Sequence, residues 1–147
     1  MNVITTLREK QKEKQIKYDR KILRELSIET LKNRVKEFFS SDGMNGPYFM
    51  DVLEESCFDV AIEAFLLGAN YSKFGHYGES VETARYRCSI EEKHLTDTLF
   101  NFILYWGKVG DNDMYNESLY YRCEAYVGAW WLEGFEKGEK RRKMRLH

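Results

Sequence analysis

Apolar positions recur at helical spacing along most of this chain, most clearly between residues 47 and 68. They stand three or four positions apart, as on one face of an α-helix: Phe49, Leu53, Cys57, Val60, Ala64 and Leu67. Pro47 suits the first turn of such a helix. A further apolar row in the second half, from Phe58 to Leu66, predicts a helix surrounded by others. We therefore expect residues 47–68 to form the central helix, most buried at 60–68.

The same periodicity predicts helices on both sides of this segment. The first covers residues 7–25, and the second runs from a cap at Ser27 to Phe39. A longer helix is predicted at 81–107 behind a cap at Ser80, and the last helix begins at a cap on Asp113. Loops are expected at 40–46 and 107–113. The fold class predicted is all-α, a bundle of four or five helices with short connections.

Glycines and aromatic residues alternate directly after the central helix. Gly68, Gly75 and Gly78 are interspersed with a group of rings: Tyr71, Phe74, His76 and Tyr77. The composition predicts a loop over 69–80, and loops of this kind carry function in many proteins. The alternative is a compact connection whose rings close one end of the bundle.

The length of 147 residues indicates one helical domain covering 1–147. We divide it into a basic N-terminal helix (1–26) whose first turns are expected to fray, a core bundle (27–138) and a basic tail (139–147). The longest apolar run, near 99–106, is too short to span a bilayer, and residues 1–14 do not resemble a signal peptide. Cys57, Cys88 and Cys123 are widely spaced on apolar faces, which is typical of reduced core thiols. These features together predict a cytoplasmic protein.

Charge is strongly segregated along the chain. Residues 1–47 carry a net charge of +4, residues 48–136 carry −10, and residues 137–147 carry +5. Basic ends on an acidic body can pair within the chain, pair between subunits, or bind an external anion.

Three polar side chains are the candidates for catalysis. Glu63 interrupts an apolar run, so it is either exposed or paired with a cation such as Arg85, Arg87 or Arg122. Glu92 falls on the apolar stripe of its helix, and His76 lies in the aromatic segment. An enzyme would require these three side chains to converge in a polar pocket.

Glu91 and His94 form a single Glu-x-x-His pair, the spacing that metal-binding helix bundles use twice. With three histidines in the chain, at 76, 94 and 147, a second such pair does not exist. By its helical angle, His94 is expected to face solvent. We predict no cofactor.

Two macromolecular partners fit the charge pattern. Nucleic acid would bind the basic ends, through Lys10, Lys12, Lys14, Lys17, Lys140, Arg141, Arg142 and Lys143. A protein partner, or a second copy of the chain, would instead bind an acidic and aromatic surface: Tyr71, Phe74, His76, Tyr77, Asp51, Glu55 and Asp59.

Several segments resemble one known family. They are CFDVAIEAFLLGANYSKFGHYGES at 57–80, KILREL at 21–26, WWLEGF at 130–135 and the basic C-terminal end. The chain resembles the YbaK-type family of small proteins from Bacillus-type, spore-forming bacteria, which is unrelated to the tRNA-editing protein of the same label. The resemblance implies a cytoplasmic protein, and it supplies no catalytic residues.

The function expected from the sequence is a non-enzymatic protein–protein interaction or regulatory module. Nucleic-acid binding through the basic ends is the first alternative. A small enzyme or metal-binding bundle using Glu63, His76 and Glu92 is the second.

Overall fold

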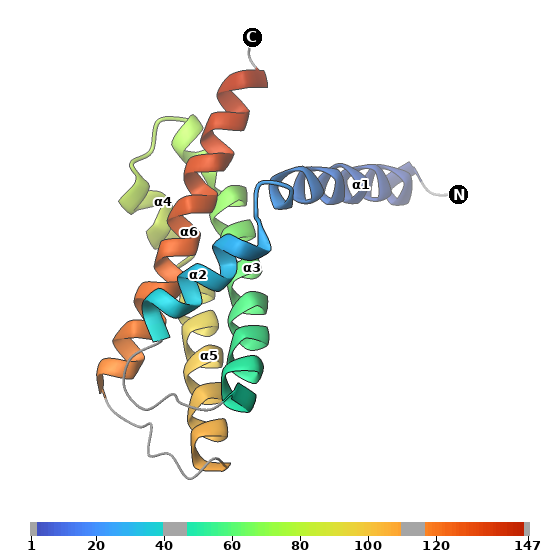
Figure 1. Cartoon of the computed structure of the whole chain (residues 1–147). Coiled ribbons are helices and arrows are strands. Elements are labelled where there is room, and N and C mark those ends of the chain that lie inside the picture. The colour runs from blue at the N-terminus through green and yellow to red at the C-terminus, as the bar shows by residue number, and fades with distance from the viewer. Residues whose placement is uncertain (1–2, 40–46, 110–116, 146–147) are drawn as a thin grey trace.

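The computed structural model describes residues 3–39, 47–109 and 117–145, and in these ranges every regular element is a helix. The predicted all-α bundle is confirmed (Figure 1). The helices are α1 (Val3–Leu23), α2 (Ile28–Phe39), α3 (Pro47–His76), α4 (Val81–Arg87), α5 (Ser89–Val109) and α6 (Glu117–Arg145). Within the described ranges, no helix is both long enough and apolar enough to span a membrane.

The two longest helices, α3 and α6, lie side by side along the molecule (Figure 1). Their backbones approach closely because glycines stand at the contact. A Cβ at Gly134 would clash with the carbonyl of Phe65, and one at Gly68 with the carbonyl of Trp131. Gly138 similarly faces Ala69. Since α3 packs against each of the other described helices, the prediction that it is central is confirmed.

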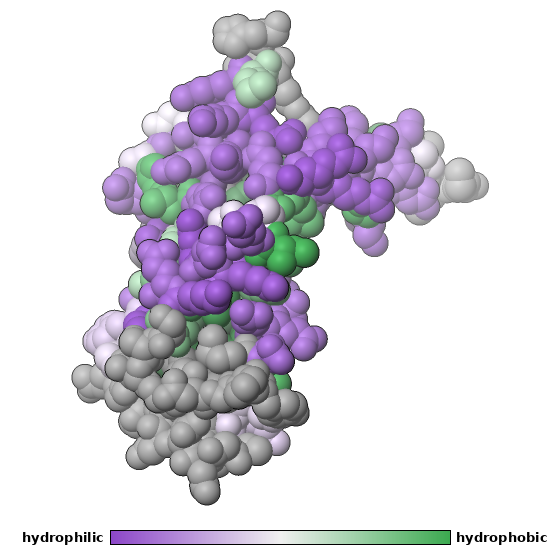
Figure 2. Space-filling model, viewed as in Figure 1, coloured by the Kyte–Doolittle hydropathy of each residue, from purple (hydrophilic) through white to green (hydrophobic). Residues whose placement is uncertain are grey.

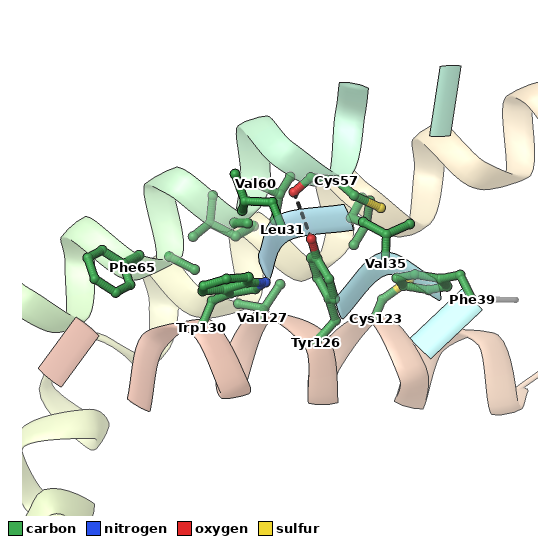
Figure 3. Packing of buried hydrophobic residues seen from close by; sticks show 14 of the residues in the cluster. Leu31, Val35, Phe39, Cys57, Val60, Phe65, Cys123, Tyr126, Val127 and Trp130 are labelled. Carbon is green, nitrogen blue, oxygen red and sulfur yellow. Dashed lines mark hydrogen bonds between the residues drawn. The ribbon is translucent and has the colours of Figure 1, made fainter. Parts of the chain in front are cut away.

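The main core is formed where α2 crosses α3 and α6 (Figure 3). These three helices contribute the buried side chains Leu31, Val35, Phe39, Cys57, Val60, Phe65, Tyr126, Val127 and Trp130. Helix α5 adds Leu95, Leu99 and Ile103, and α1 adds Ile22. The Tyr126 hydroxyl donates a hydrogen bond of 3.1 Å to the carbonyl of Cys57, which satisfies a polar group inside this apolar cluster (Figure 3).

The predicted loop over 69–80 is wrong for most of its length. Helix α3 continues through Tyr71, Phe74 and Gly75 to His76, and only residues 77–80 connect it to α4. The glycines that suggested a loop are mostly packing positions, since Gly75 faces Phe135 and Glu139 of α6. Gly78 alone adopts the left-handed region, at a φ of 105°.

The predicted helix over 81–107 is in fact two helices. The cap at Ser80 is confirmed, because its Oγ accepts the Thr83 N–H at 3.1 Å. The helix then ends at Cys88, and α5 begins at Ser89. The cap at Ser27 is also confirmed by the Thr30 N–H bond to its Oγ, 3.1 Å long. The predicted loop at 40–46 and the cap at Asp113 lie outside the described residues.

Candidate functional site

A groove of about 630 Å³ runs between α3 and α5. Helix α3 contributes Val52, Glu55, Ser56, Asp59, Val60 and Glu63, and α5 contributes His94, Leu95, Thr98, Phe102 and Trp106. The arrangement follows from the α3 sequence: while Leu53, Cys57 and Ala64 are buried, the acids at one-turn spacing remain exposed beside them. The groove therefore has an apolar floor and an acidic rim.

A second hollow of about 440 Å³ continues this groove towards the start of α5. It shares Glu63, His94 and Leu95 with the first hollow and adds Leu67, Ile90 and Glu91. His94 is exposed, as its helical angle predicted. Apart from His94, each titratable side chain lining the two hollows is a carboxylate. The charge of such a surface is complementary to that of a basic partner.

The three candidate catalytic residues lie in three different places. Glu63 is exposed in the groove, which is one of the two outcomes anticipated for it. Glu92 faces away from that groove and accepts two hydrogen bonds from Arg85, from Nε at 2.9 Å and from Nη2 at 3.1 Å. His76 ends α3, and thirteen residues of helix hold it roughly 20 Å from Glu63 along the axis. These side chains do not converge.

The Glu91–His94 pair lines the second hollow together with Glu63. Within the described ranges, no group of three His, Cys, Asp or Glu side chains is placed to hold a metal ion. Glu91 and His94 contribute polar groups to the wall of this hollow.

The predicted partner-binding surface is divided between two regions. The acidic residues Asp51, Glu55 and Asp59 are exposed on α3, and Glu55 and Asp59 line the groove. The aromatic residues lie instead at the far end of α3. Tyr71 and Phe74 are half-buried there against a cluster of Ala84, Cys88, Trp131 and Phe135.

That cluster fixes α4 to the end of the bundle. The Arg87 guanidinium lies 4.3 Å from the centre of the Phe74 ring and also forms a two-bonded ion pair with Glu79, with bonds of 2.9 and 2.7 Å. The hydrogen bonds from Arg87 lower the pKa of Glu79. The ring centres of His76 and Tyr77 lie 5.9 Å apart with the ring planes tilted by 54°, and Tyr77 is 77% exposed. Tyr71 and Phe74 thus close the bundle end, which was the structural alternative for this segment, whereas Tyr77 remains exposed.

The two basic ends of the chain meet in space, which sequence reasoning did not foresee. Arg141 donates to the Lys21 carbonyl at 3.0 Å and pairs with Glu25 at 3.5 Å. Arg142 donates to Ser72 Oγ at 2.9 Å and lies over the Tyr18 ring. Both arginines are partly buried and hold α1 against the bundle. The presumed tail is therefore part of α6 as far as Arg145.

Six lysines of these two ends lie on the surface. Lys10, Lys12, Lys14, Lys17, Lys140 and Lys143 are all exposed. Figure 2 shows hydrophilic residues covering α1 and the adjoining part of the bundle on this face. The sequence showed the two basic segments at the ends of the chain. Their contact with each other could not be predicted from it, because that contact depends on the tertiary fold.

The three cysteines are free and buried. Burial raises the pKa of the Cys88 thiol to about 11 and that of Cys123 to about 12, and it also raises the pKa of Cys57. Thiols held protonated in this way are poor nucleophiles.

Comparison with known proteins identifies the family. A family model described as "Protein of unknown function (DUF2521)" matches residues 1–147. The chain is also 28% identical over 141 residues to the uncharacterised protein YbaK of Bacillus subtilis (strain 168), covering 92% of each chain. No solved structure matches. Because the family model covers the whole chain, this protein belongs to the DUF2521 family of proteins of unknown function, as the resemblance to YbaK-type proteins indicated.

Proposed function

We propose that this protein is a non-enzymatic interaction module of the cytoplasm, and that it binds another protein through the groove between α3 and α5. The observation that carries this proposal is the combination of an apolar floor with an acidic rim along about three turns of α3. A basic amphipathic helix is the partner that such a groove fits, since it can place apolar side chains on the floor and cations on the rim.

Two further observations support this reading. The candidate catalytic side chains Glu63, His76 and Glu92 are separated, so they supply no acid–base pair. The three free, buried thiols fit a reducing compartment such as the cytoplasm.

The experiment is an affinity capture from nuclease-treated Bacillus subtilis lysate, with bound proteins quantified by mass spectrometry. The wild type is compared with a groove variant, Glu55→Lys/Asp59→Lys, and with a matched control, Glu124→Lys/Glu136→Lys. The control makes the same charge change at exposed sites on α6. We expect a protein retained by the wild type and the control and lost from the groove variant. Equal capture by all three proteins would count against the groove.

A second candidate function is nucleic-acid binding at the junction of α1 and α6. The observation that favours it is the contact of Arg141 with Lys21 and Glu25, which brings two basic segments together. Exposed lysines there would neutralise phosphates, so binding should weaken steeply with salt. Anisotropy of a labelled oligonucleotide, with the variant Lys140→Glu/Lys143→Glu as the comparison, tests this function. Salt-independent binding, or none, would exclude it.

A further inference from the structure

Helix α1 has two parts with different surroundings. Its second half is anchored to the bundle: Gln15 bonds to Asn70 at 2.9 Å, Tyr18 donates to the Ala69 carbonyl at 3.1 Å, and Ile22 is fully buried. Its first half, residues 3–14, points away from the bundle (Figure 1). We call this first half the arm.

The arm is poorly stabilised as it stands. Residues 7–14 are all exposed, and Leu7, an apolar side chain, is 55% exposed. A helical stretch whose side chains remain in solvent gains little stability from tertiary packing. Docking on another surface would both cover Leu7 and stabilise the helix.

The arm and the adjoining turn carry a row of lysines on one face. At the helical repeat, Lys10, Lys14 and Lys17 follow one another at one-turn intervals, and Leu7 lies on the same face. Glu9 lies further round the helix, whereas Glu13, three positions after Lys10 and four before Lys17, borders the row. One side of α1 is therefore mainly basic, with an apolar residue near its start.

The groove carries the complementary row. Glu55, Asp59 and Glu63 stand on α3 at one-turn spacing, so the acidic row spans roughly 12 Å and the lysine row roughly 10 Å. The groove segment of α3, residues 52–63, and the arm each span about 18 Å. Leu95 and Phe102 offer Leu7 an apolar floor beside the acids.

The arm of one molecule is held away from its own groove. The anchor at Asn70 and Ala69 lies about two turns beyond Glu63 along α3, and from there the arm runs outward, away from the bundle (Figure 1). A second copy has no such restraint.

We propose that the arm of one copy docks in the α3–α5 groove of a second copy, and that the reciprocal contact closes a two-fold dimer. This inference rests on the proposed function, because it names the partner of the same groove. Each copy has one arm and one groove. When two copies exchange arms, both grooves are occupied and no arm is left free to bind a third copy.

Charge reversal on each side of this contact tests the proposal. The arm variant is Lys10→Glu/Lys14→Glu/Lys17→Glu, and the groove variant is Glu55→Lys/Asp59→Lys/Glu63→Lys. All six positions are exposed, so both variants should fold, which circular dichroism checks. Sedimentation equilibrium of the full chain then gives the dimer dissociation constant for the wild type, for each variant, and for an equimolar mixture of the two variants.

We expect a wild-type dimer that weakens with salt and a dissociation constant at least about tenfold higher for either variant alone. The mixture should dimerise again, because each reversed arm then meets a reversed groove and each native arm meets a native groove. A monomeric wild type, a dimer unaffected by the variants, or a mixture that stays monomeric would each overturn the inference. If the wild type is monomeric in sedimentation, but the groove variant no longer retains the protein captured by the wild type, the dimer is excluded and the proposed function remains supported. If both tests fail, the groove itself is not a binding surface.

Discussion

The indole Nε1–H of Trp131 donates a hydrogen bond of 3.0 Å to Sγ of Cys88. Both residues are fully buried, and the bond joins α6 to the junction where α4 ends and α5 begins. The Cys88 thiol in turn donates to the Arg85 carbonyl at 3.4 Å. This buried polar pair holds the α4–α5 junction against α6, at a point where the apolar periodicity of the sequence continues.

Replacing Cys88 by Ala should destabilise the protein by about 1–3 kcal/mol, because the buried Trp131 N–H then lacks its acceptor. Cys88→Ser is the matched control, since a hydroxyl can accept from Trp131 and donate to the Arg85 carbonyl. We expect the serine variant to retain more stability than the alanine variant in urea unfolding followed by circular dichroism. Equal losses in both variants would mean that packing, and not the hydrogen bond, matters at this position.

Stability should fall as the pH rises above about 9. In the unfolded chain the thiols ionise near their ordinary pKa of 9.0, whereas burial raises the pKa of Cys88 to about 11 and that of Cys123 to about 12. The native state then binds more protons than the unfolded state, so the free energy of unfolding decreases with pH.

For each thiol, the free energy of unfolding should decrease by up to about 1.4 kcal/mol per pH unit. The decrease should begin near the pKa of the thiol in the unfolded chain and end near its pKa in the folded protein. Urea unfolding on both sides of pH 9 measures it, and Cys88→Ser should show a shallower slope because serine does not titrate in this range. A free energy that is constant or rises across this window would contradict the assignment.

Gly134→Ala should be strongly destabilising, by about 2 kcal/mol or more, because the added methyl group meets the α3 backbone at Phe65. Gly128→Ala is the matched control on the same helix. There the new methyl group meets only the end of the Arg85 side chain, which can move. Alanine also favours the helix by up to about 1 kcal/mol, so the control should be neutral or stabilising in thermal unfolding. Similar losses in the two variants would argue against close backbone contact of α3 and α6.

Deleting residues 1–12 should change the stability of the bundle by less than about 0.5 kcal/mol, when measured at concentrations too low for association. The anchor contacts of Gln15, Tyr18 and Ile22 remain in that variant. Tyr18→Ala, by contrast, removes the bond to the Ala69 carbonyl and the ring beneath Arg142, and should lower stability by about 1 kcal/mol or more. A large loss from the deletion would show that the arm packs on its own bundle.

The sequence predicted the parts of the fold that depend on local pattern. Apolar periodicity identified the central helix, and the serines at 27 and 80 marked two helix starts through their side-chain oxygens. The pattern misplaced the end of α3, because Gly68 and Gly75 look like loop residues when the helix that packs against them is unknown. It also missed the break at Cys88, where the buried thiol accepts a long-range hydrogen bond from Trp131.

Of the two walls of the α3–α5 groove, the sequence predicted partner-binding residues only on the α3 wall. Glu55 and Asp59 were predicted as part of a partner-binding surface, whereas Phe102, which lies across the groove from them, was not predicted as a site residue. The groove exists because α3 packs against α5, and a contact between helices far apart in the sequence cannot be predicted from the local apolar pattern. The docking roles of Arg141 and Arg142 were missed for the same reason.

The most direct test of the central claim is whether the groove binds a basic helix. A fluorescent peptide of residues 3–20 is titrated with full-length protein whose own arm is neutralised by Lys10→Gln/Lys14→Gln/Lys17→Gln, and anisotropy is recorded at low and high salt. We expect saturable binding that weakens with salt and is lost when Glu55→Lys/Asp59→Lys/Glu63→Lys is added to the protein. Binding that is absent, or unchanged by reversal of the groove charges, would contradict that claim.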